Sequence, residues 1–264
     1  MTPVEVTRGD SPVVLGLPHT GTHVPQDIRA RLNARGKGLS DTDWNIHKLY
    51  EGLLEGATMV RARFHRYVID ANRDPSGESL YPGQNTTGLV PLTDFDGAPI
   101  WDEPPSGGEI EYRRETWHAP YHAALCAELE RVKAIHGVAI LYDCHSIRAH
   151  IPFLFEGTLP DFNIGTNEGK TCAPAVAEAV EHVCRAAQGY SCVMNGRFKG
   201  GWTTRHYGRP AEGLHAIQME LAQATYMEES PPWPYLHERA GALRPHLAEI
   251  LKRLDDLGRS GALS

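Results

Sequence analysis

The chain has 264 residues, of which 41% are hydrophobic and 22% charged, and a formal net charge of −7. This composition is typical of one globular domain with ample core, and the acidic balance argues against a nucleic-acid surface, which would need a basic stripe. We find no signal peptide and no apolar run long enough to span a membrane. The five cysteines form no CxxC pair and are typical of reduced thiols. We therefore expect a single cytoplasmic domain over residues 1–264.

Strand-like and helix-like segments alternate along the chain. Short apolar runs bounded by Gly, Pro or polar residues predict buried strands, and longer segments with apolar residues three and four apart predict helices. The predicted strands are residues 13–17, 59–63, 67–70, 138–146, 152–155, 162–165, 192–195 and 214–221. The predicted helices are residues 26–33, 44–54, 110–136 (which Pro120 would kink or split), 172–187 and 235–257. Such alternation predicts an α/β layer fold with a mostly parallel sheet.

Two segments lack this periodicity. Residues 81–108 are rich in Gly, Pro, Asp and Thr, and a loop of that length is usually a functional lid or disordered. Its apolar residues favour an ordered excursion over a cleft. Residues 197–208 form a glycine-punctuated loop with many hydrogen-bond donors.

Histidines follow two of the predicted strands. Asp143 and His145 end the 138–146 strand and point to the same side, and His19 follows the 13–17 strand. In open α/β sheets, ligands bind at this carboxyl edge. A carboxylate beside a histidine is how a zinc-bound imidazole is usually supported, although such a pair alone is more often a structural hydrogen bond.

Carboxylates complete a possible metal site. Asp43 lies at the start of the predicted 44–54 helix, where Asp41 is better explained as a helix cap. Two imidazoles and a carboxylate match a catalytic zinc site with an open fourth position. Glu220, in the last predicted strand, is then either a general base or half of a buried ion pair. His118 and His122 are also four apart, but no glutamate completes an HExxH motif, so we do not expect a zincin site there.

Six motifs occur in an order that resembles the N-formylglutamate amidohydrolase family, from about residue 13 to residue 226. They are Pro18-His19-Thr20-Gly21, Asp41-Thr42-Asp43-Trp44, Asn72-Arg73-Asp74, Asp143-Cys144-His145-Ser146, Phe198-Lys199-Gly200-Gly201 and Gln218-Met219-Glu220-Leu221. The resemblance implies a three-layer α/β/α fold with a mostly parallel mixed sheet, of the phosphorylase/hydrolase-like type related to zinc carboxypeptidases. It also implies hydrolysis of N-formyl-L-glutamate to formate and L-glutamate, the last step of one histidine-degradation route.

The resemblance also assigns roles to the metal-site residues. His19 and His145 correspond to histidine ligands of one divalent metal ion, most simply zinc. Asp43 is the best candidate for the carboxylate ligand, with Asp41 as the fallback, and Glu220 corresponds to the catalytic glutamate. The chain departs from the carboxypeptidase pattern, because Thr22 stands where that pattern has a glutamate ligand.

An anionic substrate with two carboxylates calls for arginines, because Arg–carboxylate pairing is strong and oriented. Arg73, beside Asn72, is the first choice. The further candidates for substrate binding are Arg148, Arg205, Lys199 and Thr203, with His206 as a possible oxyanion donor, while Arg113 and Arg114 are better explained as solvated helix residues.

Two alternatives remain from the sequence. One is a zinc amidohydrolase for another N-acyl amino acid or a peptidoglycan-type amide. The other is a non-catalytic ligand-binding protein on the same scaffold. The expected partner is in each case a small molecule, neither nucleic acid nor membrane, and the sequence makes no prediction of oligomeric state.

Overall fold

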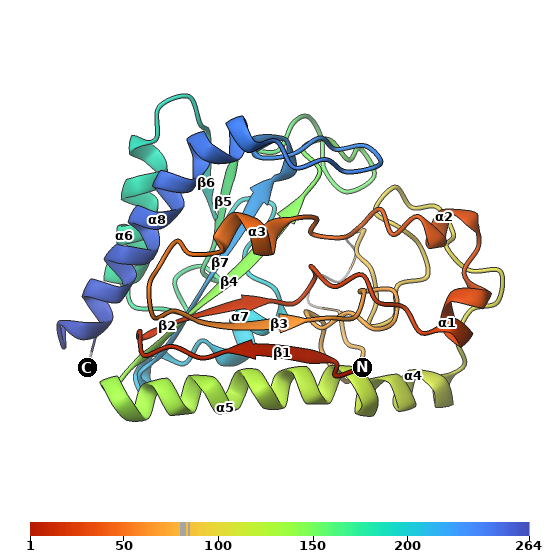
Figure 1. Ribbon diagram of the computed structural model, residues 1–264, viewed down its shortest axis with the longest axis horizontal. Coiled ribbons are helices and arrows are strands. Elements are labelled where there is room, and N and C mark those ends of the chain that lie inside the picture. Colours follow the sequence, from red (N-terminus) through yellow and green to blue (C-terminus); the bar gives the residue numbers. More distant parts are fainter. Residues whose placement is uncertain (80–82, 84, 264) are drawn as a thin grey trace.

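The computed structural model describes residues 1–79, 83 and 85–263. Within these residues, seven strands form one mixed sheet in the order β1-β3-β2-β4-β7-β5-β6 (Figure 1). β1 runs antiparallel to β3 and β5 antiparallel to β7, while the other neighbours are parallel. The strands are β1 Val4–Thr7, β2 Val13–Leu17, β3 Thr58–Ala62, β4 Ala139–Ile147, β5 Phe162–Gly165, β6 Cys192–Met194 and β7 Leu214–Ala222.

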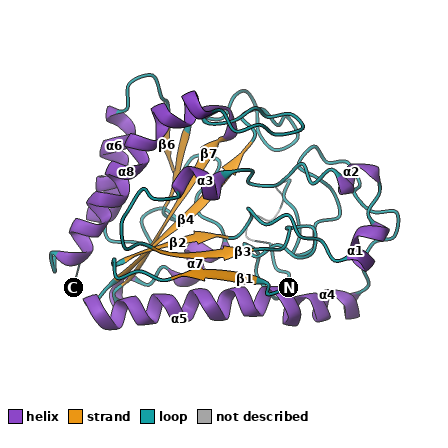
Figure 2. Cartoon of the chain, viewed as in Figure 1, coloured by secondary structure: helices purple, strands orange, loops and turns teal. Residues whose placement is uncertain are grey.

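Helices cover both faces of the sheet, which gives three layers (Figure 2). α6, α8 and the short α3 pack on one face, and α5 and α7 pack on the other. The helices are α1 Gln26–Arg31, α2 Ala34–Lys37, α3 Ile46–Tyr50, α4 Gly107–Arg113, α5 Ala119–His136, α6 Pro174–Ala186, α7 Trp202–Tyr207 and α8 His237–Arg259, with a π-helical segment at Arg114–His118 and 3-10 turns at Pro210–Glu212 and Gln223–Thr225. None of the helices in the described residues is long and apolar enough to cross a membrane.

The central strands β4 and β7 are buried along all nine of their residues. Because side chains alternate between the two faces, Tyr142 and Cys144 enter the core under α6 and α8, while Leu141 enters the core under α5. Asp143 and His145 share the second face with Leu141. Register pairs His145 with Glu220 on β7, so polar side chains of adjacent parallel strands meet at their carboxyl ends.

Most of the predicted elements are confirmed. The strands predicted at residues 13–17, 59–63, 138–146, 162–165, 192–195 and 214–221 correspond to β2, β3, β4, β5, β6 and β7. The predicted 110–136 helix corresponds to α4, the π-helical segment and α5, and it begins at a capping box formed by Ser106 and Glu109. The π-helical segment ends two residues before Pro120, which has no N–H to continue the α-helical ladder.

Two predicted strands are wrong. Residues 67–70 form a buried turn, in which Val68 N donates to His65 O and Tyr67 N to His65 Nδ1. Residues 152–155 also form a turn, with Phe155 N donating to Ile151 O. Both segments are apolar because they pack into the core or into a small cluster beneath a loop, and not because they pair in the sheet.

Three further differences concern helices and an edge strand. The predicted 44–54 helix contracts to the five residues of α3, which Gly52 and its turn follow. The predicted 197–208 loop contains α7. β1, an edge strand with little burial, was not predicted. Tyr81, Pro82 and Gln84 of the predicted 81–108 loop lie outside the described residues, and the described part is irregular up to Ser106.

Candidate metal centre and active site

Three buried side chains meet at the carboxyl edge of the sheet. His19 follows β2, Asp43 lies just before α3, and His145 is near the end of β4. One ligand atom from each lies within 4.8 Å of the other two. Asp43 Oδ2 is 3.8 Å from His19 Nδ1 and 3.4 Å from His145 Nδ1. A tetrahedral zinc holds its nitrogen and oxygen ligands roughly 3.3 Å apart, so a small closure of this group would fit the ion.

The orientation of both imidazole rings also fits a metal. His19 Nε2 lies 2.7 Å from Asp70 Oδ1, and His145 Nε2 lies 3.1 Å from Asp143 Oδ1. At His19 a proton on Nε2 then points at Asp70 and leaves the Nδ1 lone pair for a cation. His145 Nε2 also lies 3.2 Å from Asn72 Nδ2. His19 Nδ1 is buried and has no hydrogen-bond partner within the described part of the chain. A buried acceptor of this kind is available to ligate a cation.

Charges around the group set its protonation. Burial, helped by the charge of Arg66, lowers the pKa of His19 and keeps its ring neutral. Burial acts in the same direction on His145, but the surrounding carboxylates of Asp143, Asp43 and Glu220 together outweigh it, and the pKa of His145 is raised. Burial would raise the pKa of Asp43, yet the hydrogen bond with His145 and the charge of Arg66 bring it below its usual value. A cation would displace the proton from His145, since metal ligands bind in their deprotonated form.

Asp43 is anchored from two sides. Arg66 Nη2 donates to Asp43 Oδ1 over 2.9 Å, and the backbone N–H of Ser146 donates to Asp43 Oδ2 over 3.1 Å. Asp41, the alternative ligand, accepts from the Tyr67 hydroxyl and from the backbone N–H of Phe95 instead. The structure thus brings Asp43, and not Asp41, to the two histidines.

Glu220 lies beside the group, opposite His145 in the sheet. It is 7% exposed, and its Oε2 accepts a hydrogen bond from Gln218 Nε2 over 3.3 Å. Burial raises the pKa of Glu220 to about 8, with His145 pulling it down and Asp43 pushing it up. A carboxyl group with a raised pKa next to a metal-ready site is suited to receive and return a proton near neutral pH.

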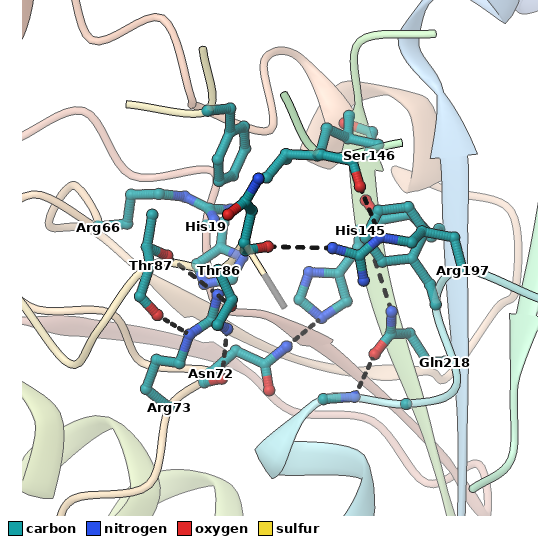
Figure 3. A pocket seen from close by; sticks show the side chains of 18 residues that line it. His19, Arg66, Asn72, Arg73, Thr86, Thr87, His145, Ser146, Arg197 and Gln218 are labelled. Carbon is teal, nitrogen blue, oxygen red and sulfur yellow. Dashed lines mark hydrogen bonds between the residues drawn. The ribbon is translucent and has the colours of Figure 1, made fainter. Parts of the chain in front are cut away.

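These residues open into one cavity of about 660 Å³ including its mouth. His19, His145 and Glu220 line its base, and three arginines, Arg66, Arg73 and Arg197, line its sides. In Figure 3, Arg66 and Arg73 lie on one side of the pocket and Arg197 on the other. The remaining polar lining comes from Asn72, Asn85, Thr86, Thr87, Ser146 and Gln218, and the apolar lining from Phe95, Ile147, Leu154 and Phe198.

The guanidinium groups of Arg73 and Arg197 are held by loop backbone. Arg73 Nε donates to Thr87 O over 2.9 Å and Arg73 Nη1 to Asn72 O over 3.0 Å. Arg197 Nε donates to Leu154 O over 3.0 Å and Arg197 Nη2 to Asn85 O over 3.2 Å. These contacts fix two positive charges that face the cavity.

Of the residues predicted to bind substrate, Asn72 and Arg73 line the cavity. Arg148 does not line it, and its Nη2 pairs with Asp96 at 3.0 Å. Lys199 pairs with Glu168 at 2.8 Å, and Arg205 Nε donates to Gly200 O. The backbone N–H of Thr203 donates to Asn72 Oδ1, so this residue holds a lining residue without lining the cavity itself.

His206, predicted as an oxyanion donor, is exposed on α7 and stacks on Trp202, with ring centroids 4.3 Å apart. It does not line the cavity. The predicted loop contains α7 at this point, and α7 places the His206 side chain away from the base of the cavity. The expected role of His206 is therefore not supported by its position.

Sequence reasoning missed Arg66, Asp70 and Arg197. Arg66 precedes the strand predicted at residues 67–70 and Asp70 is its last residue, whereas in the structure the two charged residues lie at the ends of a buried turn beside the metal group. Two charges in an otherwise apolar segment were the available signal. Arg197 lies in a loop, and nothing in its neighbours distinguishes it from other loop arginines.

The α/β/α layers and the buried His–Asp–His group beside a protonatable glutamate define a hydrolase-like site that can hold a metal ion. Comparison with known proteins makes this specific. The sequence profile described as N-formylglutamate amidohydrolase matches residues 11–227. The chain therefore belongs to the N-formylglutamate amidohydrolase family.

Two named relatives are similar in sequence to this chain over nearly its full length. The N-formylglutamate deformylase of Pseudomonas aeruginosa is 47% identical over 256 residues, which is 96% of each chain. The enzyme of the same name from Pseudomonas putida is 46% identical over 251 residues, covering 94% of this chain and 93% of that protein.

Solved structures are similar as well. An N-formylglutamate amidohydrolase from Ralstonia eutropha JMP134 superposes with a TM-score of 0.82 at 28% identity, over 99% of this chain and all of that one. A protein from Agrobacterium tumefaciens shares the fold at 18% identity, with a TM-score of 0.72 over 97% of this chain and 96% of that one.

Proposed function

We propose that this chain hydrolyses N-formyl-L-glutamate to formate and L-glutamate, with one divalent metal ion held by His19, Asp43 and His145. The observation that carries the proposal is that one cavity contains both the residues for hydrolysis and the residues for binding an anionic substrate. Its base has the metal-ready group and Glu220, and its sides have fixed arginines for an anionic substrate. The family and the names of the 46–47% identical relatives support the same substrate.

Zinc is the metal that the ligand set favours, since two imidazole nitrogens and one carboxylate leave a position open for water or substrate. When bound, the ion supplies polarisation of the formyl carbonyl and lowers the pKa of a water molecule. Asp70 holds the imidazole of His19 in the tautomer that exposes Nδ1, and Asp143 places a negative charge 3.1 Å from His145 Nε2.

Glu220 acts as the proton carrier of the proposed reaction. It accepts a proton from the attacking water and delivers it to the leaving nitrogen of glutamate as the C–N bond breaks. Gln218 Nε2 donates a hydrogen bond to Oε2 of this carboxyl group, so Oε1 is left to accept the proton of the water. The positive charge of Arg66, buried beside Asp43 and lining the cavity, is placed to stabilise the negative charge that develops on the formyl oxygen.

Arg73 and Arg197 account for the selection of a dicarboxylate. N-formyl-L-glutamate carries two carboxylates, and two guanidinium groups on different sides of the cavity can engage one each. We propose in addition that the protein acts in the cytoplasm, in the histidine-degradation route that the resemblance implies.

Formate release tests the proposal directly. Purified protein should release formate from N-formyl-L-glutamate, lose the activity on chelation and recover it with added Zn²⁺. N-formyl-L-methionine, N-acetyl-L-glutamate and a muramoyl peptide should be much poorer substrates. Undiminished turnover in chelated, metal-free protein would contradict the metal scheme, and a protein that binds N-formyl-L-glutamate without turnover would be a ligand-binding protein instead.

A further inference from the structure

Two histidines outside the cavity lie directly behind the Asn72–Arg73 segment. His122 Nε2 is 2.8 Å from the carbonyl oxygen of Ala71, and His118 Nε2 is 3.1 Å from the carbonyl oxygen of Arg73. The intervening carbonyl of Asn72 accepts from the Arg73 side chain. All three consecutive carbonyls of this segment are therefore hydrogen-bonded, two of them by imidazoles from another part of the fold.

The protonation of both histidines suits this contact. Burial lowers the pKa of His118, and it lowers the pKa of His122 to about 3, so both rings are neutral at neutral pH. A neutral ring that donates from Nε2 must accept at Nδ1. Because the Ala71 carbonyl can only accept, it fixes the tautomer of His122 with the proton on Nε2. The Tyr207 hydroxyl lies 3.1 Å both from His122 Nδ1 and from the backbone carbonyl oxygen of His122.

The spacing of the two histidines explains how both rings reach the same strip of backbone. His118 is the last residue of the π-helical segment, and His122 lies one turn further, in α5. Residues four apart are neighbours on the surface of an α-helix. Here the two rings come to lie with centroids 4.4 Å apart, on the same side of the helix.

The indole of Trp202 packs on the other side of the two rings. Its ring centroid is 5.7 Å from that of His118 and 4.8 Å from that of His122. From the same helix, the Thr203 N–H donates to Asn72 Oδ1 over 2.9 Å. Backbone and side chain of the Asn72–Arg73 segment are thus both fixed from outside the cavity.

From this geometry we propose that His118 and His122 are positioning residues for substrate recognition. They clamp the backbone on both sides of Asn72 and so aim the guanidinium of Arg73 at a substrate carboxylate. They touch neither the substrate nor the metal ligands, and they act through Arg73. The inference rests on the proposed function and adds to it the residues that set the substrate affinity from a distance.

The test is a double-mutant cycle with Arg73. We expect His118→Ala and His122→Ala each to raise KM for N-formyl-L-glutamate about 5- to 10-fold, the value of one neutral hydrogen bond, with kcat changed less than about 2-fold. In the Arg73→Ala background, the same substitutions should change KM less than about 2-fold, because the group they position is gone. Equal factors in both backgrounds would overturn the proposal.

Two controls separate positioning from general stability. His136 lies on the same helix and also bonds a backbone carbonyl, that of Asp10, so His136→Ala removes the same kind of contact far from the cavity and should leave KM unchanged. At position 118 or 122, Gln reaches the Nε2 position and should restore most of the affinity, while the shorter Asn should not. Both variants are polar, so this comparison stands even if the alanine variants fold poorly. A His122→Asn variant as good as His122→Gln would count against the proposal.

A measurement without substrate tests the positioning role of His118 and His122 separately from the proposed hydrolysis of N-formyl-L-glutamate. Amide hydrogen exchange of peptides covering residues 70–75 should become faster in His118→Ala and His122→Ala, and not in His136→Ala. If the wild-type protein releases no formate, the proposed function fails whatever the exchange shows. If it is active, and neither KM nor exchange responds to the two histidines, the positioning role alone is refuted.

Discussion

The base of the cavity and its arginine wall are built in different ways. The base, His19, Asp43 and His145 with Glu220, consists of side chains at or near the carboxyl ends of strands or in a turn, each at most 7% exposed. The arginine wall, Arg73 and Arg197, extends from loops and is held by backbone carbonyls of other loops. The strands therefore position the residues proposed to carry out the reaction, whereas hydrogen bonds between loops position the arginines proposed to bind the substrate. Substitutions in the base should change kcat or metal binding, and substitutions in the wall should change KM.

The largest effect is expected at Glu220. Glu220→Gln keeps the size and the Gln218 contact but removes the proton acceptor, and general-base catalysis contributes about 10²- to 10⁴-fold. We expect kcat to fall by that factor while the metal content stays at the wild-type level, measured by formate release and elemental analysis. Glu168→Gln, at the exposed ion pair with Lys199, is the matched control. A Glu220→Gln variant with more than a tenth of the wild-type kcat would remove Glu220 from the mechanism.

The wall should respond in KM. Arg73→Ala removes a fixed guanidinium, and hydrogen bonds to charged groups are worth about 1.5–3 kcal/mol, so KM should rise about 10- to 150-fold with kcat less affected. Arg73→Lys should recover only part of this, because an ammonium cannot make the bidentate contact. Steady-state kinetics with N-formyl-L-glutamate decide the matter. If kcat falls while KM stays constant, the contrast between base and wall is wrong at this residue.

Asp70 tests whether the base depends on its supporting carboxylates. Asp70→Asn leaves His19 in place but removes the charge that orients its ring, a change that typically lowers metal affinity 10- to 100-fold. Competition with a chromogenic chelator measures the affinity. Because Arg66 also approaches Asp70 at 3.6 Å, circular dichroism must show that the variant is folded. Wild-type zinc affinity in folded Asp70→Asn protein would argue that the His19 tautomer needs no such support.

The same division explains what could be predicted from sequence. β2, β4 and β7 show as apolar runs with polar residues at their ends, so His19, His145 and Glu220 were identifiable before the structure. Their convergence follows from strand order, which periodicity alone does not specify. Arg66 and Asp70 were missed because an apolar buried turn has the composition of a strand. Arg197, Arg148 and Lys199 are all loop cations, and only three-dimensional neighbours separate the one that lines the cavity from the two that do not.

Asp41 lies behind the cavity lining, and its effect on stability should depend on pH. Its Oδ2 accepts from the Tyr67 hydroxyl and from the backbone N–H of Phe95, a residue that lines the cavity. Burial raises the pKa of Asp41 to about 6, above the unfolded value of about 3.9. The folded state then binds the proton more tightly, so the contribution of Asp41 is most favourable below about pH 4 and declines as pH rises to about 6. Asp41→Asn should remove this decline, on the order of 3 kcal/mol for a shift of about two pKa units. Urea unfolding of the wild type and of Asp41→Asn at pH 4 and pH 7 measures this change in the free energy of unfolding. The same change between the two pH values in both proteins would contradict the raised pKa of Asp41.

The smallest effect is expected at Lys199, a residue in a family motif that the sequence suggested for substrate binding. Its ammonium pairs with Glu168, and both side chains are about half exposed, so the pair contributes about 0–1 kcal/mol to stability. It does not line the cavity, although its neighbours Phe198 and Gly200 do. The motif is then explained by its backbone, since Gly200 has a φ of 108° and Gly201 packs against Asn72 with no room for a Cβ. Lys199→Ala should change KM less than about 2-fold, while Gly201→Ala, which forces Asn72 to move, should impair activity clearly. If Lys199→Ala raised KM as much as Arg73→Ala, Lys199 would take part in substrate binding although it does not line the cavity. The substrate-binding residues would then extend beyond the cavity lining to the protein surface.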